Sequence, residues 1–235
     1  MNFLTAEWRK LILINYTVDP EILLPYLPAG TVLDLWQGQC YLSVVGFMFL
    51  NTRLCSIPIP FHCNFEEVNL RFYVKRWEEN KWKRGVVFLK EMVPKATLSF
   101  VANTFYKEHY ETVKMKHEIQ YSIQDLSVSY AWQQKRWQQI SVVAKNELTD
   151  ILPGSEAEFI TEHYWGYTGI NTLKTSAYEV VHPRWQQYPV LHYELNIDFG
   201  ASYGTPFECL NQQTPVSVML AEGSEIAVKT KKQII

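Results

Sequence analysis

Residues 65–74 read FEEVNLRFYV, and apolar and polar side chains alternate along this stretch. A period of two is typical of a β-strand, whose successive side chains point to opposite faces of a sheet. The apolar members share one face: Val68, Leu70, Phe72 and Val74. The polar members share the other face: Glu67, Asn69 and Arg71. The apolar face needs a covering core, whereas the polar face is buried only if the sheet closes around an internal cavity.

Strand signals continue on both sides of this stretch. Runs rich in Ile, Leu, Val and aromatic residues predict strands at 9–16, 31–36, 40–50, 82–92, 113–123, 127–132, 136–145 and 177–181. A closing hairpin is predicted at 216–230, turned at Glu222, Gly223 and Ser224. Helices are predicted after Asp19, over 95–107, and after Ser155, which has Glu158 in the capping-box position.

The order of these elements predicts the fold class. Many strands, few helices and no linker or repeat predict one mainly β (α+β) domain over residues 1–235. We expect a closed or nearly closed antiparallel β-barrel with a few peripheral helices.

The composition is that of an ordinary globular chain of 235 residues, 47% of them hydrophobic and 20% charged. A net charge of -2 offers no general attraction to nucleic acid or to an anionic membrane, so neither is expected as a partner. The 14% of aromatic residues indicates a core or cavity walled by large rings. The chain shows no signal peptide or membrane span, and its four cysteines contain no C-x-x-C pair, so we expect a cytoplasmic protein.

Common catalytic motifs are missing from the sequence, including G-x-S-x-G, the Walker loop, G-x-G-x-x-G and H-E-x-x-H. The six histidines lack the spacing of metal ligands, so no metal and no cofactor is expected. The polar face of residues 65–74 then has two interpretations. It is either a solvated face with a surface pair of Glu67 and Arg71, or a polar cluster inside a pocket, where each charge needs a partner.

Several ordered segments resemble a known family. They are an opening with VDPEIL, PYLPAGT and VGF, then FEEVNLRFYV, RGVVFLKE, and a late AEGSE. From Glu7 to about Val228 the chain is similar to the uncharacterised YqjF-like family, which resembles acetoacetate decarboxylase in fold. The resemblance implies a cone-like antiparallel β-barrel with a central cavity.

The decarboxylase also implies site residues: a Schiff-base lysine in a P-K-K segment, a glutamate on a nearby strand and an arginine in the cavity. The closest local match is EMVPK at 91–95, which gives Lys95 the nucleophile's place, Glu67 the glutamate's and Arg71 the cation's. Asn69 and Lys90 join Arg71 as candidates for substrate binding. Position 96 is Ala, so the second ammonium that would depress the pKa of the nucleophile is missing, and Lys90 is the candidate to replace it.

Two functions from different classes follow from these observations. The one that we favour is the binding of a small molecule in an aromatic-lined cavity, because the partner that would activate the lysine amine is missing. The alternative is a Schiff-base lyase or decarboxylase that acts on a small oxo acid through Lys95, Glu67 and Arg71. A small-molecule ligand is the expected partner, and a homo-oligomer is compatible with the sequence.

Overall fold

The computed structural model describes residues 2–58, 60–96 and 109–234. The helix predicted over 95–107 therefore lies almost wholly outside the described residues. Strands dominate the described part, which confirms the mainly β class. No helix in these ranges is long and apolar enough to cross a membrane.

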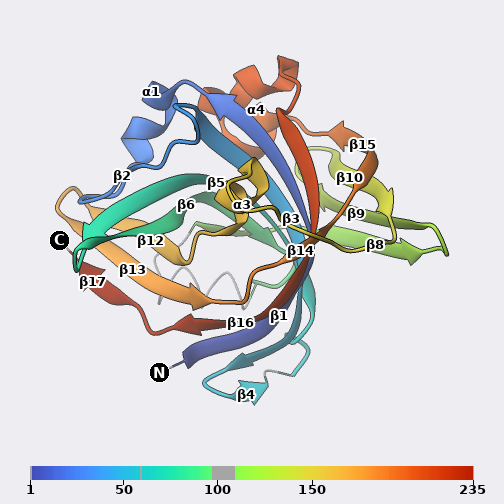
Figure 1. Cartoon of the computed structure of the whole chain (residues 1–235), viewed down its shortest axis with the longest axis horizontal. Helices are drawn as coiled ribbons and strands as arrows, with labels where there is room; N and C mark the ends of the chain where they lie inside the picture. Colours follow the sequence, from blue (N-terminus) through green and yellow to red (C-terminus); the bar gives the residue numbers. More distant parts are fainter. Residues whose placement is uncertain (1, 59, 97–108, 235) are drawn as a thin grey trace.

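The central feature is a large sheet that closes into a ring (Figure 1). Seven of the described strands make this ring, each hydrogen-bonded to the next and the last to the first: β16 (Ser217–Lys229), β1 (Asn2–Val18), β3 (Cys40–Leu54), β5 (Phe65–Glu78), β6 (Lys81–Val93), β12 (Trp165–Asn171) and β13 (Lys174–Val181). All contacts in the ring are antiparallel except that between β6 and β12. Short strands extend the sheet: β2 (Val32–Leu33), β4 (Ile57–Pro58), β7 (Tyr110–Thr112), β11 (Thr149–Asp150), β14 (Gln186–Tyr188) and β17 (Lys232–Ile234).

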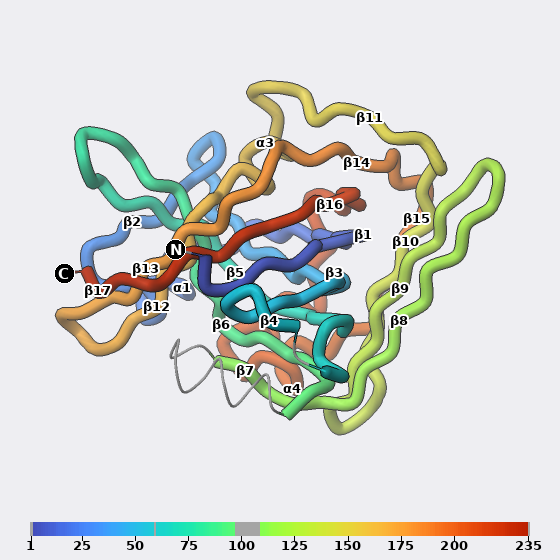
Figure 2. The backbone as a smooth tube through the Cα atoms, turned by 90° about the horizontal axis from the view of Figure 1, so that it is seen from below, coloured from blue at the N-terminus to red at the C-terminus, as the bar shows by residue number. Residues whose placement is uncertain are grey.

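A second antiparallel sheet flanks the ring (Figure 2). Its order is β15 (Val190–Asn196), β10 (Trp137–Lys145), β9 (Asp125–Gln133) and β8 (Met115–Tyr121). A hydrophobic core fills the space between this sheet and the outer face of the ring, and the apolar members of β5 belong to it together with Val128, Tyr130 and Trp132. The outward face of β5 is therefore covered, as its apolar side chains require.

Short helices complete the described fold: α1 (Pro20–Leu23), the 3-10 helix η1 (Leu24–Tyr26), α3 (Glu156–Thr161), α4 (Phe199–Tyr203) and the 3-10 helix η2 (Thr205–Gln212). Two predicted caps are confirmed, because the Asp19 side chain accepts from the Glu21 amide and the Ser155 side chain accepts from the Glu158 amide. Helix α3 enters the second hydrophobic core, inside the ring, where Phe159 contacts Tyr41 and Tyr73.

The hairpin predicted at 216–230 is wrong. Strand β16 runs unbroken through Gly223, which lies opposite Arg9 of β1. Gly223 has a φ of +80°, and a Cβ atom at this position would lie 2.0 Å from the carbonyl oxygen of Trp8. Glycine is thus required by the close approach of β1 and not by a turn, a distinction that the local sequence does not make.

We predict that Gly223→Ala lowers the free energy of unfolding by about 3 kcal/mol or more, because the left-handed backbone and the steric overlap with Trp8 add together. Gly38→Ala is the matched control. Gly38 has a φ of +81°, but a Cβ atom added there would meet no other atom within 4 Å, so only the backbone penalty of about 1 kcal/mol applies. Urea titration of both variants measures the difference, and equal losses would contradict the close approach.

Candidate functional site

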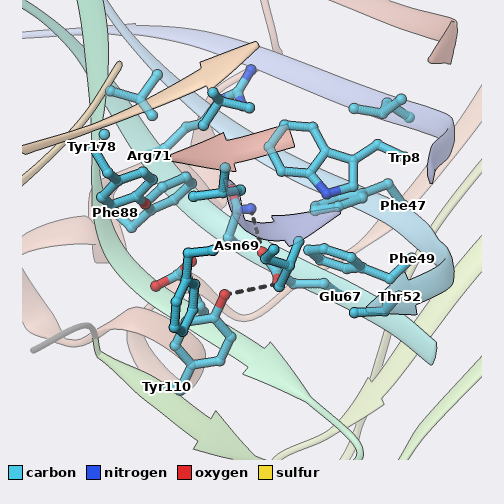
Figure 3. Close-up of a pocket in the computed structure, with 18 of the residues that line it drawn as sticks. Trp8, Phe47, Phe49, Thr52, Glu67, Asn69, Arg71, Phe88, Tyr110 and Tyr178 are labelled. Atoms are coloured by element: carbon cyan, nitrogen blue, oxygen red, sulfur yellow. Dashed lines mark hydrogen bonds between the residues drawn. The ribbon is translucent and has the colours of Figure 1, made fainter. Parts of the chain in front are cut away.

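The interior of the ring holds a cavity of about 170 Å³ (Figure 3). Aromatic side chains from several ring strands and from β7 make up much of its wall: Trp8, Phe47, Phe49, Phe65, Phe88, Tyr110, Trp165 and Tyr178. These rings pack on one another, with Phe49 stacked on Phe65 at 4.7 Å and Trp8 edge-on to Phe47 at 5.4 Å between centroids. The wall is therefore rigid and mostly apolar.

The polar face of β5 points into this cavity. Glu67, Asn69 and Arg71 all line it, and they are only 2%, 1% and 8% exposed. Strand β5 is paired on both sides, by β3 and by β6, so its inward side chains cannot reach solvent at a sheet edge. Of the two interpretations of the sequence, the polar cluster in a pocket is the one that the geometry supports.

Glu67 has hydrogen-bond donors on both carboxylate oxygens. The Asn69 Nδ2 donates to Oε1 at 2.9 Å and the Tyr110 hydroxyl donates to Oε2 at 3.1 Å (Figure 3). Tyr110 reaches the site because β7 pairs in parallel with β6, on which Glu91 also lines the cavity. The Asn69 Oδ1 is buried and accepts no hydrogen bond. This end of the cavity thus presents an already satisfied carboxylate beside an unused amide oxygen.

Arg71 lies two residues further along the same face and is less well satisfied. Its guanidinium carbon lies 5.7 Å from the ring centroid of Tyr73, and its Nε atom is buried with no hydrogen-bond partner. No carboxylate of the described residues forms an ion pair with it. The predicted partner for this charge is therefore missing from the described residues, and the two donors described for Glu67 are neutral. A buried cation in this state favours an anion that enters the cavity.

His163 is a cavity residue that sequence reasoning missed, because its spacing resembles no motif. It follows α3, and its Nε2 atom lies 3.2 Å from the Oδ2 atom of Asp34, 129 residues away. Burial lowers the pKa of His163 to about 4, aided by the positive charges of Arg84 and Arg71, against the opposing effect of Asp34. The imidazole is therefore neutral at pH 7.

Asp34 is the buried centre of a charge cluster behind His163, whose cations are partly exposed. Its carboxylate pairs with Lys75 at 3.0 Å and with the Nε atom of Arg84 at 2.6 Å. Burial acts to raise the pKa of Asp34, but the hydrogen bonds from His163, Arg84 and Lys75 outweigh it and hold this pKa well below its usual range. Asp34 is therefore ionised and can only accept hydrogen bonds.

The two candidate lysines lie elsewhere. Between Leu70 and Arg71 the register with β6 shifts, so that Lys90 faces Leu70 and Phe88 faces Arg71. This bulge turns Lys90 to the outer face, where it donates to the Ser202 carbonyl at 2.7 Å and pairs with Glu111 at 2.5 Å. Lys95 is half-buried just after β6 and is not among the described residues that line the cavity. The site roles of both lysines stay predictions.

Within the described ranges, no group of three or more His, Cys, Asp or Glu side chains is arranged to hold a metal ion. The described cavity residues offer the guanidinium of Arg71, a neutral imidazole, and the carboxylates of Glu67 and Glu91 inside an aromatic wall.

Comparison of the sequence with known proteins identifies a matching family and a relative. The family model DUF2071, described as an uncharacterized conserved protein, matches residues 5–225. "Uncharacterized protein YqjF" of Bacillus subtilis (strain 168) is 32% identical over 112 residues, which are 47% of this chain and 45% of the relative. The match thus spans less than half of that relative's length.

Solved structures share the fold at low sequence identity. Acetoacetate decarboxylase from Legionella pneumophila has a TM-score of 0.67 and 11% identity, over 99% of this chain and 87% of its own. The enduracididine biosynthesis enzyme MppR, complexed with pyruvate, has a TM-score of 0.67 and 12% identity, over 99% of this chain and 91% of its own. The expected likeness in fold to acetoacetate decarboxylase is confirmed, and identities this low show the fold alone.

We predict that Arg71→Met leaves the free energy of unfolding unchanged or raises it by up to about 4 kcal/mol, because an apolar side chain replaces a buried cation without an ion pair. Arg84→Met is the contrast. It removes one partner of the buried Asp34 carboxylate and should lower stability by about 2 kcal/mol. Urea titration compares the two variants, and a loss above about 1 kcal/mol in Arg71→Met would show that its charge is paired after all.

We predict that stability falls as the pH is lowered from about 6.5 towards 4, because the folded His163 binds its proton less readily than the unfolded chain does. The difference in pKa corresponds to roughly 3 kcal/mol, all of which is present at pH 7 and lost once the pH is below about 4. Urea titrations at pH 7, 5.5 and 4.5 measure this loss. His163→Phe should flatten it, and an unchanged pH dependence in that variant would contradict the assignment.

Proposed function

The chain belongs to the DUF2071 family, and from its cavity we propose that it binds a small carboxylic acid with an apolar body inside the ring. The carboxylate lies against Arg71, and the apolar body lies among the aromatic rings. This proposal sharpens the small-molecule binding that the sequence favours.

The observation that carries the proposal is the unsatisfied guanidinium of Arg71. A buried charge without a partner is strongly unfavourable, and a cavity that retains one gains most from a ligand of opposite charge. Guanidinium and carboxylate form the strong charge-assisted hydrogen bonds that are typical of such sites. Glu67 does not compete for the same role, because neutral donors already occupy both of its oxygens.

The size of the cavity limits the ligand. A cavity of about 150 Å³ is known to hold one benzene molecule. The 170 Å³ found here therefore suit one ring, or a branched chain of similar size, with a carboxylate attached. The structural neighbour MppR was solved with pyruvate, a small acid, which supports this class of ligand without identifying it.

The alternative function, a Schiff-base lyase acting on a small oxo acid, requires the Lys95 amine to reach the cavity. Lys95 follows β6, four residues after the cavity residue Glu91, which brings it near the site along the chain. The lyase would also use Glu67 as its carboxylate. The two functions share the cavity but differ in one respect, because only the lyase forms a covalent bond to the protein.

We predict that phenylacetate binds to the protein and that Arg71→Met weakens the binding by about 10- to 100-fold, since a charge-assisted hydrogen bond is lost. Isothermal titration calorimetry measures both affinities. The neutral analogue phenylacetamide should bind more weakly than phenylacetate and should not respond to Arg71→Met. Lys90→Met, which removes a cation from the outer face of β6, should leave the affinity for phenylacetate unchanged.

Equal loss of affinity in Lys90→Met and Arg71→Met would mean that the acid does not enter the ring. The same protein treated with pyruvate and borohydride tests the lyase. Added mass on the peptide that carries Lys95, absent in Lys95→Arg, would establish a Schiff base and replace the binding function with a catalytic one.

A further inference from the structure

Strand β8 is an edge of the sheet that flanks the ring. It pairs with β9 on one side, and no strand of the described residues pairs with its other side. Figure 1 shows the hairpin of β8 and β9 projecting away from the ring. An edge strand carries a row of backbone donors and acceptors that another strand can use.

The register with β9 shows which residues of β8 direct their backbone groups to the free edge. The amide of Gln133 donates to the carbonyl of Lys114 at 2.8 Å, which continues the register of the two strands. In an antiparallel ladder every second residue bonds to the partner strand, and the residues between direct their N–H and C=O groups to the other side. The even-numbered residues of β8 therefore bond to β9. The odd-numbered residues face the free edge with their backbone: Met115, His117, Ile119 and Tyr121.

This edge is open to solvent. No hydrogen bond from the described part of the chain reaches the edge-directed backbone groups of His117 and Ile119. The His117 side chain is 41% exposed, and Tyr121 is 59% exposed. Met115 and Ile119 pack on the core between the two sheets, so the strand is held in place from one face only.

The charges of β8 complement those of a second β8. Lys116 and Glu118 are both exposed on its solvent face and lie two residues apart. If two copies of β8 pair antiparallel about a two-fold axis at His117, Lys116 of each copy lies opposite Glu118 of the other. Opposite charges in such positions stabilise a strand pair. We propose that the chain forms a two-fold symmetric dimer in which β8 pairs with β8 of a second copy.

The register follows from the free backbone groups and the charges. Odd-numbered residues must lie opposite odd-numbered residues, and the symmetric registers that pair more than half of them are centred on His117, Glu118 or Ile119. A centre at Glu118 brings two carboxylates together, and a centre at Ile119 sets Glu118 opposite the neutral Gln120. The centre at His117 forms two ion pairs and sets Met115 opposite Ile119, two apolar side chains on the same face.

The side chains involved are free to make this contact. The Lys116 ammonium lies 4.4 Å from the ring centroid of Trp137, and Glu118 accepts from the Gln120 amide. Both charged side chains are long and exposed, so they reach the edge by a change of rotamer.

The dimer joins the two flanking sheets into one, with β8 and its copy at the centre. A two-fold contact is closed, so no third copy adds at this edge. Each His117 stays on its own ring, where its Nδ1 atom lies 3.2 Å from the Oε2 atom of Glu66. Glu66 lies on the outer face of β5, and the cavity lies on the inner face, so the dimer does not depend on the proposed function.

Sedimentation velocity over a range of protein concentrations measures the dimer. We expect Lys116→Glu and Glu118→Lys each to weaken dimerisation by about tenfold or more, because each variant places like charges opposite each other twice. The variant with both substitutions restores opposite charges and should dimerise as the unaltered protein does. It is the matched control, since it keeps the net charge and, like Lys116→Glu, lacks the contact with Trp137.

A second pair of variants tests the backbone contact. His117→Pro removes an N–H group that points to the free edge and takes no part in the ladder with β9, so it should abolish the dimer. His117→Ala removes the same imidazole but keeps the N–H group, and should dimerise. Urea titration checks that both variants are folded.

Hydrogen exchange of the unaltered protein gives a readout without a variant. In dilute solution we expect the amides of His117 and Ile119 to exchange quickly and those of Lys116 and Glu118 to be protected by β9. At concentrations where the dimer forms, His117 and Ile119 should become protected as well. A monomer at every concentration, a dimer with these two amides unprotected, or a double charge variant that fails to dimerise would overturn the inference.

Discussion

The structure depends on the closure of the large sheet into a ring. Closure rests on a short contact in which Val180 lies opposite Val228 and Val181 opposite Ala227. Without it, β5 would have one wet face, and Glu67 and Arg71 would be ordinary surface charges worth little to stability. With it, both faces of β5 are buried. The burial of the same charges then has a large effect on the free energy of folding.

The buried polar side chains differ in how many hydrogen-bond or ion-pair partners they have. Glu67 is held by donors within the protein, and Asp34 is surrounded by cations. Arg71 and His163 retain unpaired atoms at the cavity wall. Sites that bind ligands commonly keep such unmet groups at the expense of stability, because the ligand completes them. The cavity wall is therefore not optimised for the stability of the protein alone.

Sequence reasoning succeeded where the controlling interaction is local. The alternation along residues 65–74 placed Glu67, Asn69 and Arg71 on one face, and the capping roles of Asp19 and Ser155 followed from neighbouring residues. These features involve a period of two or a contact within three residues, which a single sequence displays directly.

The sequence could not reveal features that depend on distant strands. His163 and Asp34 are 129 residues apart, so their contact has no local signature. The bulge that turns Lys90 outward is a property of the register between β5 and β6. Gly223 lies in a stretch whose residues are typical of a turn. Glycine is needed there because the backbone of Trp8 lies too close for a side chain. Tertiary contacts override local signals at each of these positions.

The strand pairings around the ring differ greatly in length. Strand β1 pairs with β3 from Leu4 to Val18, whereas the hairpin of β12 and β13 is joined to the rest of the described ring by two residue pairs on each flank. Few ladder hydrogen bonds need to break before this hairpin separates from β6 and β16. Local unfolding therefore has its lowest free energy at this side, and amide hydrogens there exchange with solvent before those of β1 and β3.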